Sequence, residues 1–177
     1  MRWVAIVAAV LVGVVVLVVV IGYMLPVSHV ASRSAELPAP PDSVWRAITD
    51  VSAMPTWRPD VSSVEVLAPV NGRSRWREVG TNGTITFETL ESTPPTRFVA
   101  RIADDALPFG GSWTYVVTAT PNGTRLEITE NGDVRNPVFR FMSRFVFGHH
   151  PTMDAYLAAL GAHLRRNSRP IATAGVR

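Results

Sequence analysis

Glu78 is the side chain whose chemistry would change most with its surroundings. It belongs to the segment RSRWREV, where alternation along a strand places Trp76 and Glu78 on one face and Arg73, Arg75 and Arg77 on the other. If Trp76 points into an apolar interior, so does Glu78. A carboxylate there would have a raised pKa and could act as a general acid or base. The alternative, which we favour, is that Glu78 ends a strand in water, and Glu78 is kept as the one catalytic candidate.

A second group of residues suits ligand binding. Small-molecule sites are mostly apolar with a few polar groups, and large side chains recur here at inward-facing strand positions and along the last helix. The candidate ligand-binding residues are Trp57, Trp76, Phe87, Phe98, Trp113, Tyr115, Tyr156, Leu157 and Leu160. The alternative for each of them is ordinary hydrophobic core.

Other kinds of site find little support in the sequence. There is no cysteine, which excludes disulfides and thiol nucleophiles, and no Ser/His/Asp arrangement or phosphate loop is recognisable. His149 and His150 are adjacent, so their side chains point apart, and we expect no metal and no cofactor. The 17 Lys and Arg positions are all arginine and face 14 acids, and a net charge of +3 indicates no nucleic-acid partner. The arginine row of RSRWREV could attract anionic lipid head groups, although a solvated face is favoured.

These candidates all follow an apolar N-terminal segment. Residues 3–25 hold no charge, and 23 residues at about 1.5 Å each reach roughly 34 Å, which is enough for a bilayer core of about 30 Å. Trp3 and Tyr23 lie near its two ends, where aromatic rings with a polar edge prefer to sit, and Pro26 follows. The segment is therefore predicted to be a transmembrane helix that holds the rest of the chain at a cell membrane as a single-pass protein.

A cleaved secretory signal is the competing interpretation of this segment. The apolar run is longer than the core of a signal, about 7 to 15 residues, and the possible cleavage sites after Ala31 or Ala35 lack the small residues that are required. Orientation is balanced, because Arg2 and the amino terminus precede the span and Arg33 follows it. The positive-inside comparison leans slightly towards an inside N-terminus and an outside C-terminal domain.

The remaining chain is predicted to form one domain over residues 29–166 and a flexible tail over residues 167–177. A strand is followed by two short helical segments over residues 39–60, and then the hydrophobic period changes to two, with Asn-Gly and Pro pairs as turns. The expected strands are His29 to Leu37, Ser63 to Leu67, Arg73 to Val79, Thr84 to Glu91, Arg97 to Ile102, Ser112 to Thr120 and Thr124 to Val134.

Two helices are expected after the last strand. Asn136 can cap the first, Pro137 suits its first position and Gly148 its end, and its apolar residues fall in one arc of about 160°. We expect that arc to pack on the sheet, with contact to the membrane interface or gating of a pocket as the alternatives. The second helix runs from Pro151 to about Arg166 and has a narrower apolar stripe.

Three stretches resemble the START-like, or helix-grip, superfamily, and in particular its polyketide cyclase/dehydrase (SRPBCC) family. They are PDSVWRAITDVSAMPTWRPDVSSVEV, GGSWTYVVTATPNGTRLEITENGDV and NPVFRFMSRFVFGHHPTMDAYLAAL, within a resemblance that covers nearly all of residues 29–166. It implies an α+β fold in which a curved antiparallel sheet wraps around a long C-terminal helix, leaving an apolar cavity that binds lipids, polyketides or other hydrophobic small molecules. The membrane anchor is a departure from the usual soluble member.

The function expected from these observations is membrane-anchored, non-catalytic binding of a hydrophobic small molecule, with the bilayer and that ligand as partners. One alternative is a cyclase or dehydratase that uses acids of the same cavity, such as Glu78. Another is a partner-binding membrane adaptor whose cavity has collapsed. The sequence does not define the oligomeric state.

Overall fold

The structure of the protein is a computed structural model that describes residues 2–148 and 150–167. His149 and nearly all of the predicted tail therefore lie outside the described residues. In chain order the elements are α1 (Arg2–Met24), β1 (Ser28–Leu37), α2 (Pro41–Thr49), η1 (Val51–Thr56), β2 (Val61–Val70), β3 (Arg73–Gly80), β4 (Gly83–Thr93), β5 (Arg97–Ile102), β6 (Phe109–Thr120), β7 (Gly123–Val134), α3 (Pro137–Met142), η2 (Ser143–Phe147) and α4 (Pro151–Asn167).

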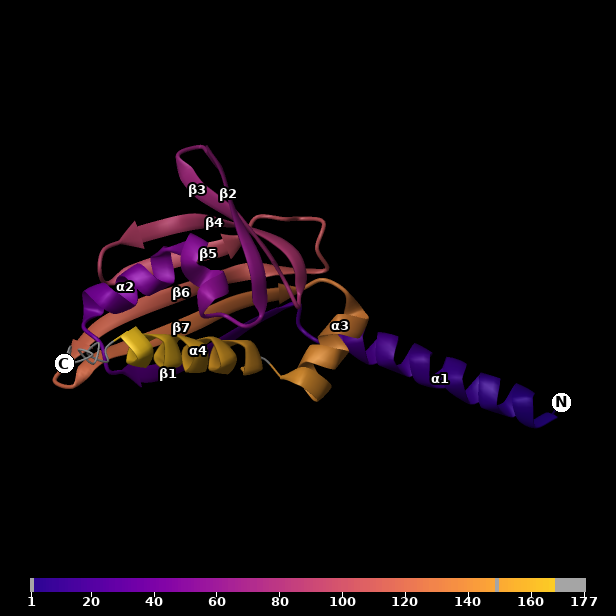
Figure 1. Cartoon of the computed structure of the whole chain (residues 1–177). Helices are drawn as coiled ribbons and strands as arrows, with labels where there is room; N and C mark the ends of the chain where they lie inside the picture. Colours follow the sequence, from indigo (N-terminus) through magenta and orange to yellow (C-terminus); the bar gives the residue numbers. More distant parts are fainter. Residues whose placement is uncertain (1, 149, 168–177) are drawn as a thin grey trace, which may run out of the picture.

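The strands form one antiparallel sheet of seven in the order β1-β7-β6-β5-β4-β3-β2 (Figure 1). Strands β2 to β7 are a meander of neighbours, and β1 pairs with β7, so the first strand of the domain lies beside the last. The Asn122-Gly123 hairpin has the tight register that its sequence predicts, with Thr120 opposite Gly123. The predicted antiparallel meander and the α+β helix-grip class are confirmed, and the structure adds the pairing of β1 with β7.

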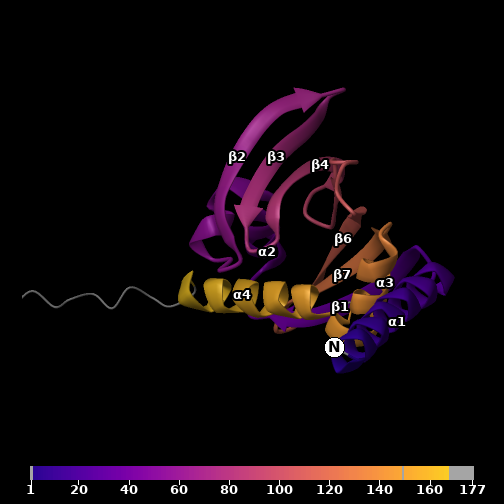
Figure 2. The same ribbon diagram turned by 90° about the vertical axis from the view of Figure 1, so that its right-hand side faces the viewer.

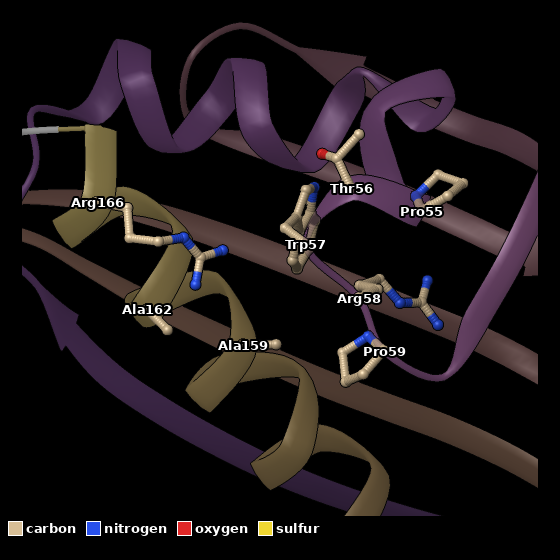
Figure 3. A pocket seen from close by; sticks show the side chains of 8 residues that line it. All are labelled: Pro55, Thr56, Trp57, Arg58, Pro59, Ala159, Ala162 and Arg166. Atoms are coloured by element: carbon tan, nitrogen blue, oxygen red, sulfur yellow. The ribbon is translucent and has the colours of Figure 1, made fainter.

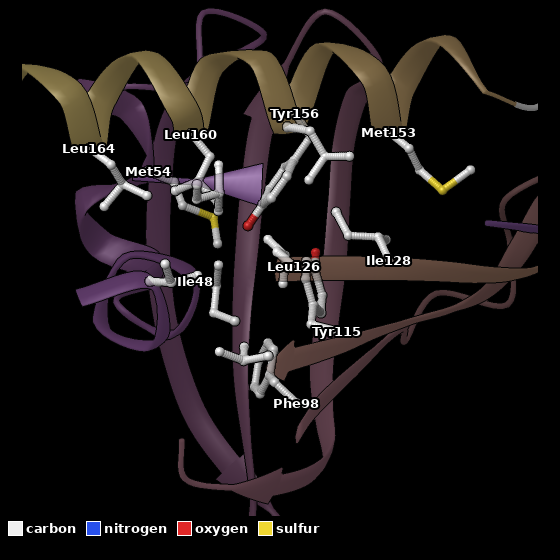
Figure 4. Close-up of a cluster of buried hydrophobic side chains, with 14 of the residues drawn as sticks. Ile48, Met54, Phe98, Tyr115, Leu126, Ile128, Met153, Tyr156, Leu160 and Leu164 are labelled. Carbon is white, nitrogen blue, oxygen red and sulfur yellow. The ribbon is translucent and has the colours of Figure 1, made fainter. Parts of the chain in front are cut away.

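Helix α4 lies across the concave face of this sheet. Its buried residues follow the predicted stripe, and Met153 and Leu160 are completely buried against the strands (Figure 4). Its closest strand is β1, whereas β2, β3 and β4 arch away from it (Figure 2). The domain core is therefore the space between α4 and the concave face.

The two short helices α2 and η1 cover the concave face beside α4. Val44 and Ile48 of α2 are fully buried, which is the amphipathic pattern of a short surface helix. The Asp50 side chain accepts a hydrogen bond from the Ala53 backbone N–H at the start of η1, which is a 3-10 helix that contains Pro55. Because η1 ends there, the chain turns and places Trp57 in the core.

Helix α1 leaves the domain as a single rod (Figure 1). It is 23 residues long, with a mean hydropathy of 3.5, and none of its most apolar window is buried against the domain. By length and composition it is able to cross a membrane, and an N-terminal signal sequence has the same properties.

The amphipathic helix after β7 differs from expectation in its packing. It is helical over residues 137–147, as α3 and the π-helical turn η2, but α3 packs against the end of α1 instead of laying its apolar arc on the sheet. The Val134 N–H donates to the Val27 carbonyl, so β7 ends where α1 joins β1. The nearest apolar surface for α3 is then the last turn of α1, since α4 already occupies the concave face.

We predict that the stability of the domain depends on the contact of α4 with the sheet. Leu126→Ala, at a fully buried position of β7, should lower the free energy of unfolding by about 2–5 kcal/mol, because it leaves a cavity. The control Leu90→Ala lies at a position that is 39% exposed and should cost much less. Urea unfolding of the detergent-solubilised protein, followed by tryptophan fluorescence, measures both, and equal losses would contradict the assignment of the core.

Candidate ligand-binding site

The nine predicted ligand-binding residues come together in one cluster between α4 and the concave face. Seven of them are buried, and Phe87 and Trp113 are partly buried and pack against the others. Figure 4 shows Phe98, Tyr115 and Tyr156 pointing into this space from β5, β6 and α4. The residues thus line a common interior. Whether they bind a ligand or only form the core is a separate question.

Tyr156 is at the centre of the aromatic residues in this interior. Its ring centroid is 5.3 Å from that of Trp57 and 5.7 Å from those of Trp113 and Tyr115. The pairs with Trp57 and Trp113 are edge-to-face and the pair with Tyr115 is tilted, and ring pairs at these distances are favourable beyond the area that they bury. The interior is therefore a continuous aromatic surface supplied by η1 and its following turn, by β6 and by α4.

The Tyr156 hydroxyl is buried, and it makes no hydrogen bond of standard geometry with any described residue. Burial raises the pKa of Tyr156, and the charge of Arg58 only partly offsets that effect, so the hydroxyl keeps its proton at neutral pH. The Tyr115 hydroxyl is near enough to lower the pKa of Tyr156, but burial has the larger effect. Burial also dominates the raised pKa of Tyr115 itself. A buried hydroxyl without a partner costs free energy, which a ligand oxygen or nitrogen could recover.

Glu78 and Trp76 are both buried, so they share an inward face, and the favoured expectation that Glu78 ends its strand in water is wrong. Glu78 is nevertheless not an isolated carboxylate. Its Oε2 accepts a hydrogen bond from Arg58 Nη1 at 3.0 Å, and its Oε1 accepts one from Trp76 Nε1 at 2.9 Å. Its side chain is 10% exposed. Both carboxylate oxygens are thus occupied by donors of the protein itself. This geometry is typical of a structural ion pair, and it differs from the unpaired carboxylate that the catalytic hypothesis requires.

Arg58 is the residue of this site that the sequence analysis missed. Its Nη2 donates to Asp60 Oδ2 at 2.6 Å, and its guanidinium lies 5.4 Å from the centroid of the Tyr156 ring. Burial alone would lower the pKa of Arg58, but the hydrogen bond to Asp60 and the charges of Glu78 and Asp60 raise it. The stretch WRPD could have indicated this residue, because only Pro59 separates Arg58 from Asp60, and the two side chains can pair across that proline.

A hollow of about 350 Å³ opens at the surface beside this cluster (Figure 3). It is formed where the turn after η1 faces α4, and it is lined by Pro55, Thr56, Trp57, Arg58, Pro59, Ala159, Ala162 and Arg166. Its volume falls within the usual range for small-molecule sites, about 300–1,000 Å³. Trp57 and Arg58 belong both to this hollow and to the cluster around Tyr156, so the surface opening adjoins the aromatic interior.

Trp57 offers a second unpartnered polar atom at this position. Its Nε1 is buried and has no hydrogen-bond acceptor within the part of the chain that the structure describes. The indole lies 5.3 Å from Tyr156 and 5.8 Å from the His163 ring, between centroids. Burial, followed by the charge of Arg166, lowers the pKa of His163 and favours its neutral form. The Trp57 and Tyr156 rings thus contact each other, and each of the two side chains has a polar atom without a hydrogen-bond partner.

A second hollow, of about 400 Å³, lies at the hairpin between β6 and β7, beside the end of β1. It is lined by Glu36, Leu37, Pro38, Thr120, Pro121 and Asn122. Because none of the predicted ligand-binding residues lines it, we do not assign it to the site.

The inward face has another carboxylate with similar partners. Glu130 Oε2 accepts a hydrogen bond from Trp113 Nε1 at 3.0 Å, and its Oε1 lies 3.3 Å from His29 Nε2. Its side chain is 23% exposed. The polar groups of the interior are therefore few, and most of them are already paired.

The arginine row of β3 lies on the convex, outer face. Arg73 and Arg101 both donate to Glu88, and Arg77 donates to Glu65. The hydrogen bond from Arg101 lowers the pKa of Glu88 most, and burial opposes it. Two of the three arginines of the row, Arg73 and Arg77, are thus paired with carboxylates, which favours a structural role over attraction of lipid head groups. The Nε of Arg75 is buried and has no partner among the described residues. Within residues 2–148 and 150–167, no group of three or more His, Asp or Glu side chains is arranged to hold a metal ion.

Comparison with known proteins identifies the fold. Residues 28–165 match a family model described as polyketide cyclase / dehydrase and lipid transport. The Zhui aromatase/cyclase from a Streptomyces species has a TM-score of 0.66 at 19% identity, over 84% of this chain and 99% of that one. A START superfamily protein from Mycobacterium smegmatis has a TM-score of 0.61 at 18% identity, over 79% of this chain and 99% of that one.

The di-domain ARO/CYC protein BexL also has a TM-score of 0.66, at 17% identity over 81% of this chain. The match spans only 52% of BexL, about half of its length. Among curated proteins, none matches this sequence. At these identities the similarities establish the fold alone.

The ion pairs of Arg58 predict an acid-sensitive domain. Burial would raise the pKa of Asp60, but the hydrogen bond and charge of Arg58 outweigh it, so the pKa is lowered. A lowered folded-state pKa stabilises the fold above the unfolded value, about 3.9, and this contribution is lost as pH falls through the folded value. Asp60→Asn should therefore lose less stability than the native protein between pH 6 and pH 2.5, as measured by urea unfolding. Asp105→Asn, at a fully exposed side chain, is the control and should follow the native curve.

Proposed function

The chain belongs to the polyketide cyclase / dehydrase and lipid transport family, and from this membership and the site geometry we propose that it binds a hydrophobic small molecule in its sheet-helix interior. A lipid, isoprenoid or polyketide-like compound fits this proposal. The observation that supports it most is the buried Tyr156 hydroxyl, which lacks a partner among the described residues while aromatic rings surround it. A bound ligand with a polar group would satisfy that hydroxyl.

The surface hollow beside Trp57 and Arg58 is the proposed access to this interior. Its wall on α4 consists of Ala159, Ala162 and the side chain of Arg166. Small side chains on the helix leave room for a flat or branched apolar group. Because the Trp57 indole lines the hollow and also contacts the Tyr156 ring, a rotation of the indole would open the hollow towards Tyr156. Ligand uptake on this route therefore begins with a side-chain movement of Trp57.

The same proposal gives α1 the role of a membrane anchor. Its length and composition suit a span, and the linker from Leu25 to β1 is only a few residues long. Residues 3–25 would then hold a ligand-binding domain of residues 29–166 at the surface of the cell membrane, followed by a tail of residues 167–177. The outside location of this domain rests on the small charge difference between the two ends of the span.

An enzyme of cyclase or dehydratase type is the second candidate function. The observation in its favour is that two carboxylates, Glu78 and Glu130, lie on the inward face next to aromatic rings. The observation against it is that donors of the protein already occupy both carboxylates. An enzyme of this kind would lose turnover in Glu78→Gln while keeping its ligand affinity, and unchanged turnover would exclude Glu78 as the acid or base.

Photo-crosslinking tests where a ligand binds. The full chain in lipid nanodiscs is irradiated with a diazirine-bearing fatty acid or with a diazirine-bearing neutral polycyclic compound. Binding in the interior predicts adducts on peptides that contain Trp57, Trp113 or Tyr156, which lipid around α1 alone cannot produce. Mass spectrometry of organic extracts should also show a co-purified apolar compound at about one per chain. Adducts confined to α1, together with a clean extract, would contradict the proposal.

Tyr156→Phe separates a binding role from a purely structural one. It removes only the unpartnered hydroxyl, so the stability of the empty protein should stay the same or rise. Loss of one hydrogen bond to the ligand, about 0.5–1.5 kcal/mol, should weaken uptake of the photoreactive compound on the order of 2- to 10-fold. Tyr23→Phe, at an exposed position of α1, is the matched control and should change neither property. Unchanged uptake in Tyr156→Phe would exclude this hydroxyl as a ligand contact.

A further inference from the structure

The segment formed by α3 and η2 carries the largest apolar side chains that the domain leaves exposed. Phe139 is 51% exposed, Phe145 60%, Val146 58% and Phe147 61%. Three of these residues are consecutive, and the π-helical turn η2 has no buried residue at all. Contiguous exposed apolar surface of this kind is uncommon on a soluble domain and marks a contact surface.

This surface is fixed in place beside the end of α1. The buried Arg140 side chain donates to the Leu25 carbonyl at 3.0 Å and to the Arg135 carbonyl at 3.1 Å. Its guanidinium also lies 5.9 Å from the centroid of the Tyr23 ring. Gly22 is buried under the Pro137 backbone, and a side chain at position 22 would collide with it. These contacts hold α3 at the level of the last turn of α1, which is where a membrane-spanning α1 would leave the hydrocarbon core.

From these positions we propose that α3 and η2 form a second membrane contact, which inserts Phe139, Phe145, Val146 and Phe147 into the head-group boundary of the same bilayer that α1 crosses. The proposal rests on the anchoring role of α1 that is proposed above. It extends that role, because a domain with two contacts has a defined orientation on the membrane, whereas one on a short linker alone is free to tilt.

The chemistry of the segment favours a lipid surface over a protein partner. Residues 137–147 contain no acidic residue and two arginines. Arg140 is buried and points towards α1, whereas Arg144 is exposed beside the phenylalanines, where lipid phosphates would lie. The exposed residues Phe145, Val146 and Phe147 are consecutive, so their side chains spread over a wide arc of the turn instead of forming a narrow stripe. A wide apolar arc with one arginine beside it suits the boundary between lipid tails and head groups, whereas a protein groove covers a narrow stripe.

Membrane contact at this end has a consequence for the proposed ligand site. The hollow at Trp57 and Arg58 is formed with the C-terminal half of α4, whereas α3 and η2 precede the N-terminal end of that helix (Figure 1). With α3 and η2 in the bilayer, the hollow would face away from the membrane. Orientation is therefore an outcome that can be measured separately from ligand binding.

Depth-dependent quenching of single labels in the full-length protein tests the proposal. The native chain has no cysteine, so Val146→Cys, Val66→Cys and Val12→Cys each accept one environment-sensitive NBD label. Val66 is the matched control, because this valine is 65% exposed and belongs to β2, at the opposite edge of the sheet from β1, which follows α1. Val12 reports on the span itself. Each labelled protein is reconstituted at a low protein-to-lipid ratio into phosphatidylcholine and phosphatidylglycerol vesicles, with or without brominated lipids.

We expect the label at position 146 to be quenched several-fold more strongly than the label at position 66. Equal, weak quenching at both positions overturns the proposal. So does efficient disulfide formation when unlabelled Val146→Cys protein is treated with a mild oxidant, which would show that a second copy covers the surface. If the label at position 12 is quenched and the label at position 146 is not, the anchoring role of α1 is supported and the proposed membrane contact of α3 and η2 is overturned. If neither is quenched, α1 does not span the bilayer and the anchoring role fails as well. Quenching at position 146 without quenching at position 12 would contradict the anchoring role of α1, and with it the proposal of a second contact beside a membrane span.

Discussion

The burial of one helical stripe on one curved face is the constraint on which this structure depends. Helix α4 has apolar side chains along one side only, and the concave face of the sheet is the surface that can cover them. The strands that cover α4 form a curved meander, and the first strand, β1, pairs with the last, β7. Tyr156 is brought to the middle of the interior as part of this same contact. The element that stabilises the fold therefore also supplies the central residue of the proposed site.

The interior tolerates charge only where the charge is paired. Arg58 is held by Glu78 and Asp60, and the indole N–H groups of Trp76 and Trp113 each satisfy an inward carboxylate. Desolvation would otherwise make these groups costly. Among the described residues, the aromatic cluster around Tyr156 contains two of the buried polar atoms that lack partners, Trp57 Nε1 and the Tyr156 hydroxyl. Both belong to neutral side chains that can donate, which suits recognition of a hydrophobic molecule with an acceptor group.

The two ends of the domain have different surfaces. At one end, α1, α3 and η2 expose aliphatic and aromatic side chains around a single buried arginine. Towards the other end, the turn after η1 and the C-terminal half of α4 enclose a small hollow beside charged side chains. This arrangement agrees with a domain that would face lipid at one end and exchange a small molecule away from it.

The sequence by itself determined the parts of this protein that arise from local periodicity. Alternation and Asn-Gly turns located the strands, capping residues located the helix after β7, and the uncharged run located the exposed helix α1. Alternation also placed Trp76 and Glu78 on the same face of their strand, because the side-chain period of a strand is fixed, but only the structure showed that this face points inward. Only the tertiary structure decided which groups meet. It paired Glu78 with Arg58 across 20 residues of chain, and it set α3 on α1 instead of on the sheet. No local period encodes such contacts, because they depend on where the sheet curves and on which surfaces remain uncovered once α4 is in place.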